Sequence, residues 1–108
     1  MSDTQASRRR ARIWVDDERI AAFCRAHRIR KLALFGSVLS DDFRPDSDVD
    51  VLVEFEPGQR VGYVGLAGLE IELTGILGRE VDLRTPAELS RYFRQAVLDS
   101  AEVCYVRG

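Results

Sequence analysis

Apolar residues recur along this chain with the periods of helices and short strands. Ile20, Phe23 and Cys24 share one helical face behind acidic residues suited to capping, which predicts a helix over about residues 16–28. A continuous apolar run over 31–35 stops at Gly36, as expected of a strand buried on both faces. The later periods predict, in chain order, a loop over 40–47, a strand over 49–55, a helix over 60–77, a strand over 79–84, a helix over 86–99 and a closing strand over 103–106.

This order of elements predicts an α+β fold, a small mixed β-sheet with helices packed on one side. The chain has 108 residues, of which 45% are hydrophobic, and this is enough for one compact core but too short for two ordinary domains. We therefore expect residues 1–12 to form a flexible basic tail and residues 13–108 to form a single domain.

The composition narrows the class of protein. With 16 basic and 18 acidic side chains the net charge is −2, so the chain lacks the positive excess typical of nucleic-acid binding, and direct contact with DNA or RNA is not expected. Cys24 and Cys104 stand far apart in apolar surroundings, which favours reduced thiols and a cytoplasmic protein. The sequence contains no apolar stretch suited to a signal peptide or a membrane span.

Two acids at the start of the second predicted strand carry the first candidate chemistry. Asp48 and Asp50 are two residues apart, so in a strand their carboxylates project from the same face. At about 4 Å two such charges repel by roughly 1 kcal/mol in water and roughly 4 kcal/mol at a partly shielded site, unless a cation lies between them. Hard oxygen ligands of this kind suit Mg²⁺, which fills its remaining positions with water and substrate phosphates. The alternative is a strand-entry turn with solvated acids.

The turn at Gly36-Ser37 suits a phosphate. Glycine lets a phosphate approach the backbone, Ser37 offers a hydroxyl donor, and a helix starting here would point N–H groups at the anion. A simple N-cap role for Ser37 is compatible with this. Asp82 lies in an apolar predicted strand, and with Asp48 and Asp50 it would complete a two-metal site for phosphoryl transfer. As a single acid in a strand, it is otherwise a surface residue.

The order of these motifs resembles a known superfamily. Gly36-Ser37, then ten residues, then Asp48-x-Asp50 and a later Asp82 is similar to the pattern of the DNA polymerase β-type nucleotidyltransferases. This resemblance implies the polymerase β-like palm fold and a chemistry that uses magnesium and ATP.

The small size and the segments 44–55 and 77–83 resemble more specifically the minimal nucleotidyltransferase antitoxins, which are paired with HEPN-domain toxins in prokaryotes. The resemblance covers about residues 16–107. It implies that the chain transfers AMP from ATP to a tyrosine of a cognate HEPN ribonuclease, silences that toxin and forms a hetero-oligomer with it.

Carried over by position, the resemblance also implies roles for single residues. Asp48 and Asp50 would bind both magnesium ions. Asp82 would bind the catalytic ion and help to deprotonate the incoming hydroxyl, while Gly36 and Ser37 would hold the triphosphate.

One departure from the family keeps other functions open. Many members carry a basic residue and a glycine soon after Gly-Ser, where this chain has Ser40-Asp41-Asp42. Extra acids near the phosphates would weaken ATP binding, unless they face solvent. The first alternative is therefore a catalytically weak or inactive antitoxin that neutralises its toxin by binding alone, although the full set of three carboxylates argues against it. The second keeps the chemistry and changes the acceptor, to an antibiotic or a nucleic-acid end.

Overall fold

The computed structural model describes residues 7–107, with side chains from residue 11 onward. Its strands are β1 (Ser7–Arg10), β2 (Ile13–Asp16), β3 (Ile29–Phe35), β4 (Val49–Phe55), β5 (Val81–Arg84) and β6 (Glu102–Val106). Its α-helices are α1 (Asp17–Ala26), α2 (Tyr63–Leu77) and α3 (Arg91–Ser100), and its short 3₁₀ helices are η2 (Gly36–Leu39) and η3 (Pro86–Glu88).

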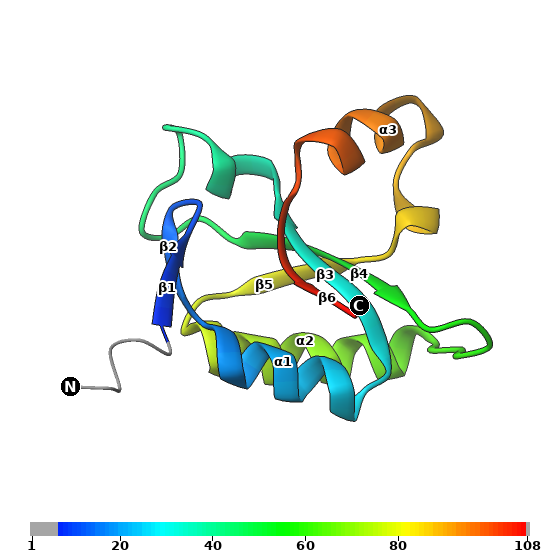
Figure 1. Ribbon diagram of the computed structural model, residues 1–108. Helices are drawn as coiled ribbons and strands as arrows, with labels where there is room; N and C mark the ends of the chain where they lie inside the picture. Colours follow the sequence, from blue (N-terminus) through cyan, green and yellow to red (C-terminus); the bar gives the residue numbers. More distant parts are fainter. Residues whose placement is uncertain (1–6, 108) are drawn as a thin grey trace.

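A four-stranded sheet with the order β5-β4-β3-β6 forms the centre of the molecule (Figure 1). β3 is antiparallel to both β4 and β6. β4 and β5 are parallel, since α2 carries the chain back across the sheet between them. The prediction of an α+β fold with a small mixed sheet is confirmed. The register places Phe35 opposite Asp50 and Asp50 opposite Asp82, so both acids lie near the point where β3 ends.

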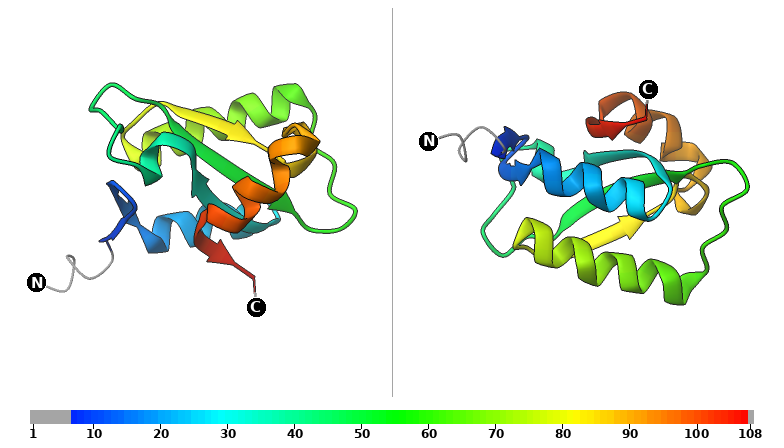
Figure 2. Two further views of the ribbon diagram at one scale, coloured as in Figure 1. Left: turned by 90° about the horizontal axis from the view of Figure 1, so that it is seen from above. Right: turned by 60° about the horizontal axis from the view of Figure 1, so that its bottom comes forward.

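The hydrophobic core lies between one face of the sheet and helices α1 and α2, which run side by side along it (Figures 1 and 2). Side chains alternate between the two faces along each strand. Those that face the core are Leu32, Leu34, Val49, Val51, Val53, Val81 and Leu83. Asp50 and Asp82 lie between these positions and therefore point from the opposite face. The acids therefore lie on the face opposite α1 and α2, where Ala33 and Leu52 are also buried.

Helix α3 differs from α1 and α2. It lies beyond the opposite side of the sheet from these two helices (Figure 1), and none of its residues is buried. Two large apolar side chains, Tyr92 and Phe93, are 80% and 66% exposed. The helices packed against one side of the sheet are therefore α1 and α2.

The single helix expected over 86–99 is divided in the structure. Thr85 and Glu88 form a capping box around the short helix η3, after which Leu89 is extended with φ −77° and ψ 142°. Ser90 then caps α3, because its hydroxyl accepts a hydrogen bond from the Tyr92 N–H at 3.3 Å. Ser side chains compete in this way for backbone groups and are favoured at N-caps, and here Ser90 starts a separate helix.

The N-terminal segment also differs from the expected tail over residues 1–12. β1 pairs antiparallel with β2, and Ala11 takes a positive φ of 55° in the connection between them. Ile13 and Val15 are 4% and 1% exposed, so the hairpin is fixed by a strand that belongs to the core. Their alternation with the exposed Trp14 is the signal for a strand that the expectation of a tail overlooked. Residues 1–6 of the expected tail lie outside the described residues.

Two further expectations concern the thiols and the membrane. Cys24 and Cys104 form no disulfide within residues 11–107, in line with the predicted reduced thiols, and Cys24 is fully buried. Within residues 7–107, every helix is too short or too polar to span a lipid bilayer.

Candidate functional site

The turn at the end of β3 brings the backbone against an acid. Gly36 has a φ of 79°, a left-handed conformation that favours glycine. A Cβ placed on Gly36 would lie only 2.2 Å from Asp50 Oδ2. Glycine is therefore required at this position for two reasons, its positive φ and its lack of a side chain. The lack of a side chain leaves room for the Asp50 carboxylate beside the turn.

After Gly36 the chain forms the four-residue helix η2. Val38 is fully buried and anchors it, and the Ser40 N–H and hydroxyl donate to the Ser37 carbonyl at 2.9 and 3.1 Å. Within residues 11–107 the Ser37 hydroxyl has no hydrogen-bond partner, so it is available to a ligand. A helix this short has a weak dipole, so a phosphate here would depend on the Ser37 hydroxyl and the backbone at Gly36.

Asp50 and Asp82 are brought together by the parallel pairing of β4 and β5, in which they are direct partners. Asp50 is partly buried. Burial raises its pKa above the ordinary value of 3.8, and the charges of Asp82 and Asp48 raise it further. The charges of both other predicted acids, Asp82 and Asp48, therefore reach Asp50.

Asp48 lies in the exposed end of the loop before β4, and other parts of the chain hold that loop. The Val49 N–H donates to the Glu80 carbonyl at 2.9 Å, and the Arg79 guanidinium donates to the Pro45 carbonyl at 3.0 Å. Each of these two hydrogen bonds joins the end of the loop to the segment just before β5. The start of β4, with Asp48, is thereby fixed relative to the start of β5, with Asp82.

Arg84 is a site residue that the sequence did not identify. It follows Asp82 by two residues in β5, and its Nη2 donates to Asp82 Oδ2 at 3.2 Å. Its charge also lowers the pKa of Asp50, against the other three causes. The signal in the sequence is the Asp82-x-Arg84 spacing, which puts both side chains on one face of a strand.

Within the described part of the chain, no three or more His, Cys, Asp and Glu side chains gather closely enough to hold a metal by themselves. Mg²⁺ does not require such a cage, because it commonly binds through one or two carboxylates and completes its shell with water and phosphates. Asp50 is the strand partner of Asp82, and its pKa is raised by burial and then by the charges of Asp82 and Asp48, which fits this mode of binding. The donor set would suit a magnesium ion that takes its remaining ligands from water or phosphate oxygens.

The acidic segment after the turn faces solvent. Asp41 forms an ion pair with Arg12, and the Asp41 side chain is 93% exposed. Asp42 is also exposed, and its backbone N–H donates to Ser40 Oγ at 3.2 Å. One of the two acids beyond Gly36-Ser37 is thus paired with a cation, which reduces its repulsion of a phosphate.

A hollow between α1 and α2 lies away from these acids. It is lined by His27, Leu69 and Glu72 among others, and His27 Nε2 lies 3.1 Å from Glu72 Oε1. The hollow belongs to the helical side of the sheet, whereas Asp50 and Asp82 project from the other side. We therefore place the candidate site at the acids and not at this hollow.

The family described as "Nucleotidyltransferase domain" matches residues 17–104 of the chain. This range contains the turn, both strand acids, Asp48 and Arg84. The chain is 36% identical over 78 residues to the protein adenylyltransferase MntA of Thermococcus cleftensis, covering 72% of this chain and 75% of that protein.

Solved structures share the fold. A candidate minimal nucleotidyltransferase superposes with a TM-score of 0.65 at 35% identity, over 79% of this chain and 85% of that one. A chain in the complex of the tri-AMPylated Shewanella oneidensis HEPN toxin with MNT antitoxin superposes with a TM-score of 0.61 at 19% identity, over 84% and 70% of the two chains. The second likeness concerns the fold alone.

Proposed function

The chain belongs to the nucleotidyltransferase domain family, and we propose that it is a magnesium-dependent protein adenylyltransferase that acts as an antitoxin. It transfers AMP from ATP to a tyrosine of a cognate HEPN ribonuclease, which neutralises that toxin, and it forms a hetero-oligomer with it in the cytoplasm. The observation that carries the proposal is the position of the Asp50 carboxylate, against the Gly36 turn and beside Asp82. The adenylyltransferase MntA, similar over most of both chains, supports the same activity.

Each residue has a role in this proposal. Gly36 and Ser37 hold the triphosphate, through close backbone approach and through the free hydroxyl. Asp48 and Asp50 hold both magnesium ions, and Asp82 holds the catalytic one. Bound magnesium supplies charge neutralisation of the triphosphate and a more acidic acceptor hydroxyl.

The reaction balances as a displacement at phosphorus. The tyrosine oxygen forms a bond to the α-phosphorus of ATP as the bond to pyrophosphate breaks, and AMP remains on the toxin. The phenolic proton leaves toward Asp82, whose partly exposed carboxylate projects from the face of the sheet opposite α1 and α2. Residues 13–108 act as the single domain that carries these steps.

The proposal is tested by transfer of label. The chain is incubated with magnesium, ATP labelled in the α-phosphate and the HEPN protein encoded next to it. Label is expected on the toxin with the wild-type chain, to be lost with Asp48→Ala and to persist with Asp46→Ala. Asp46 is a matched control, since it is an exposed acid of the same loop. Absence of label from the toxin with the wild-type chain would refute the proposal.

The second candidate is an antitoxin that acts by binding alone, and it is favoured by the segment Ser40-Asp41-Asp42, which stands where many members of the family carry a basic residue and a glycine. The two functions differ in their dependence on Asp50. A transferase with Asp50→Ala fails to rescue cells from the toxin, although the two proteins still co-purify. A binding antitoxin with the same substitution still rescues them.

A further inference from the structure

Arg84 lies on the acidic face with most of its donors unused. Its side chain is 47% exposed, and its only hydrogen bond within residues 11–107 goes from Nη2 to Asp82 Oδ2 at 3.2 Å. A guanidinium has five N–H donors in a rigid fork that matches two oxygens of a carboxylate or a phosphate. The contact with Asp82 therefore uses a small part of what Arg84 offers.

The charge of Arg84 reaches beyond Asp82. It acts on Asp50 as well, in opposition to the burial of that acid and to the charges of Asp82 and Asp48. In the register of the sheet Arg84 is opposite Leu52, two positions along β4 from Asp50. One guanidinium thus stands beside both strand acids, at the place where they would receive a cation.

We propose that Arg84 binds the triphosphate of the nucleotide and that its contact with Asp82 belongs to the nucleotide-free protein only. Magnesium at Asp82 would compete with Arg84 for the charge of this carboxylate and would repel the guanidinium, whereas the phosphates would attract it. Arg84 therefore exchanges one anionic partner for another of the same geometry. This inference rests on the nucleotide site of the proposed function and adds a residue to it.

The test is calorimetric titration of Mg²⁺ with AMP-PNP, in the absence of toxin, into the wild-type chain and three variants. Arg84→Gln is expected to raise the Kd for AMP-PNP roughly ten- to hundredfold, the usual effect of losing a hydrogen bond to a charged group. Arg84→Lys should lose less, because lysine keeps the charge and not the fork.

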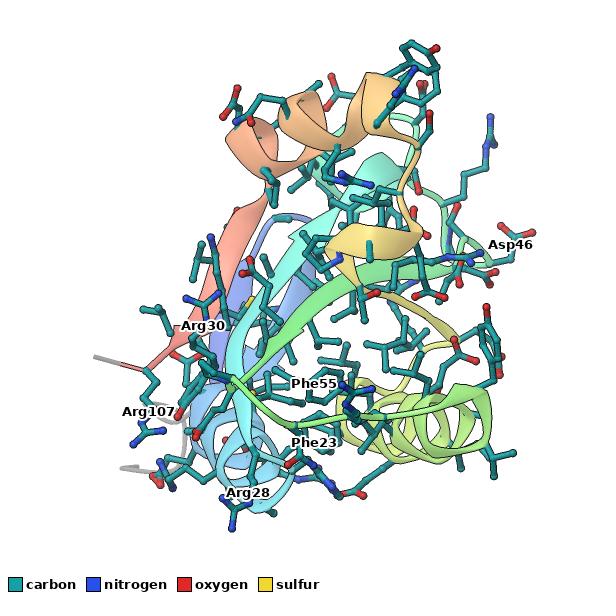
Figure 3. All side chains as sticks on the ribbon, turned by 90° about the vertical axis from the view of Figure 1, so that its right-hand side faces the viewer. Phe23, Arg28, Arg30, Asp46, Phe55 and Arg107 are labelled. Atoms are coloured by element: carbon teal, nitrogen blue, oxygen red, sulfur yellow. The ribbon has the colours of Figure 1, made fainter. Side chains whose placement is uncertain are left out.

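Arg107→Gln is the matched control and should leave the Kd unchanged. Arg107 is 59% exposed and pairs with Glu56 at 2.5 Å, so its substitution also breaks one exposed ion pair. Figure 3 shows Arg107 beside Arg30, far from Asp46 and the start of β4. A cooperative thermal unfolding transition in each of the Arg84→Gln and Arg107→Gln variants checks that both are folded.

A second titration with Mg²⁺ alone separates phosphate binding from an effect on Asp82. Arg84→Gln should bind Mg²⁺ as well as the wild type or better, because a competing cation has been removed. An unchanged Kd for AMP-PNP in Arg84→Gln overturns the inference, and so does an equal loss of affinity for Mg²⁺ and for AMP-PNP. A chain that binds AMP-PNP through Arg84 but labels no toxin would refute the proposed function and leave this inference intact.

Discussion

Replacing Asp50 by Asn should stabilise the protein when magnesium is absent. Asp50 carries its charge in a partly buried position, where the charges of Asp82 and Asp48 act on it. Asparagine has nearly the same shape and no charge, so it keeps the packing beside Gly36 and removes the repulsion. Most single substitutions destabilise a protein. A gain in stability on substitution of Asp50 would therefore be diagnostic.

The size of the gain follows from the sheet. Asp50 and Asp82 are partners on adjacent strands, and such strands lie about 4.8 Å apart. Two unit charges at that separation repel by about 3 kcal/mol at an effective dielectric constant of about 20, and by about 1 kcal/mol in water. The Asp82 side chain is 38% exposed and paired with Arg84, so screening favours the lower value. A gain of about 1 kcal/mol raises the Tm of a chain of this size by about 4–8 °C.

The gain should also depend on pH. Because burial and the two neighbouring acids raise the pKa of Asp50 above 3.8, the folded protein binds this proton more tightly than the unfolded chain does. Ionisation of Asp50 therefore destabilises the fold: the penalty is absent below the ordinary pKa and complete above the raised one. Asp50→Asn should stabilise fully at about pH 7 and lose its advantage at about pH 3.

Thermal unfolding followed by circular dichroism in EDTA measures both effects. Asp46→Asn serves as the control, because this exposed acid of the same loop should leave the Tm unchanged. Addition of Mg²⁺ and AMP-PNP should raise the Tm of the wild type more than that of Asp50→Asn, since ligand binding to the folded state adds to its stability. Equal Tm values of wild type and Asp50→Asn in EDTA at neutral pH would show that the acids do not converge.

Two other substitutions and one labelling experiment probe the turn and the core. Gly36→Ala should lower the Tm and abolish AMP-PNP binding, because its Cβ would lie 2.2 Å from Asp50 Oδ2. Gly58→Ala is the control: Gly58 has a φ of 85° and no neighbour within 4 Å of an added Cβ. This substitution should cost about 1–2 kcal/mol of backbone strain and leave AMP-PNP binding unchanged. Equal AMP-PNP affinities of the two variants would contradict this. A thiol reagent should modify Cys104 in the folded protein and spare Cys24, whose burial raises its pKa to about 12. Equal rates by mass spectrometry would refute that difference.

The part of the site that could be predicted from the sequence depends on local signals. A strand that ends at a glycine and a pair of acids two residues apart are readable without the fold, because conformation and side-chain alternation are properties of neighbouring residues. Gly36 and Asp50 were expected on these grounds, and the structure brings them into contact. That they bind nucleotide and metal stays a prediction.

The remainder depends on pairings between distant segments. The adjacency of Asp50 and Asp82 is fixed by the register of β4 against β5, which the crossover helix α2 sets and no local pattern reports. Arg84 shares a face with Asp82 in β5, yet its importance is visible only when β4 is placed beside it. The sequence did not predict the division of the last helix at Ser90 for another reason. The Ser90 hydroxyl caps a new helix start, and helical periodicity alone does not distinguish this from one continuous helix.

The alternation of β4 separates stability from chemistry within a few residues. Val49, Val51 and Val53 are fully buried against α1 and α2 and hold the sheet to its helices. Asp50, between the first two, points from the other face and costs stability through its charge. A substitution at Asp50 that stabilises the metal-free protein and abolishes AMP transfer cannot act through unfolding. Its effect on the reaction would then report the loss of a ligand for the metal and nucleotide, because the fold on the opposite face of the same strand remains intact.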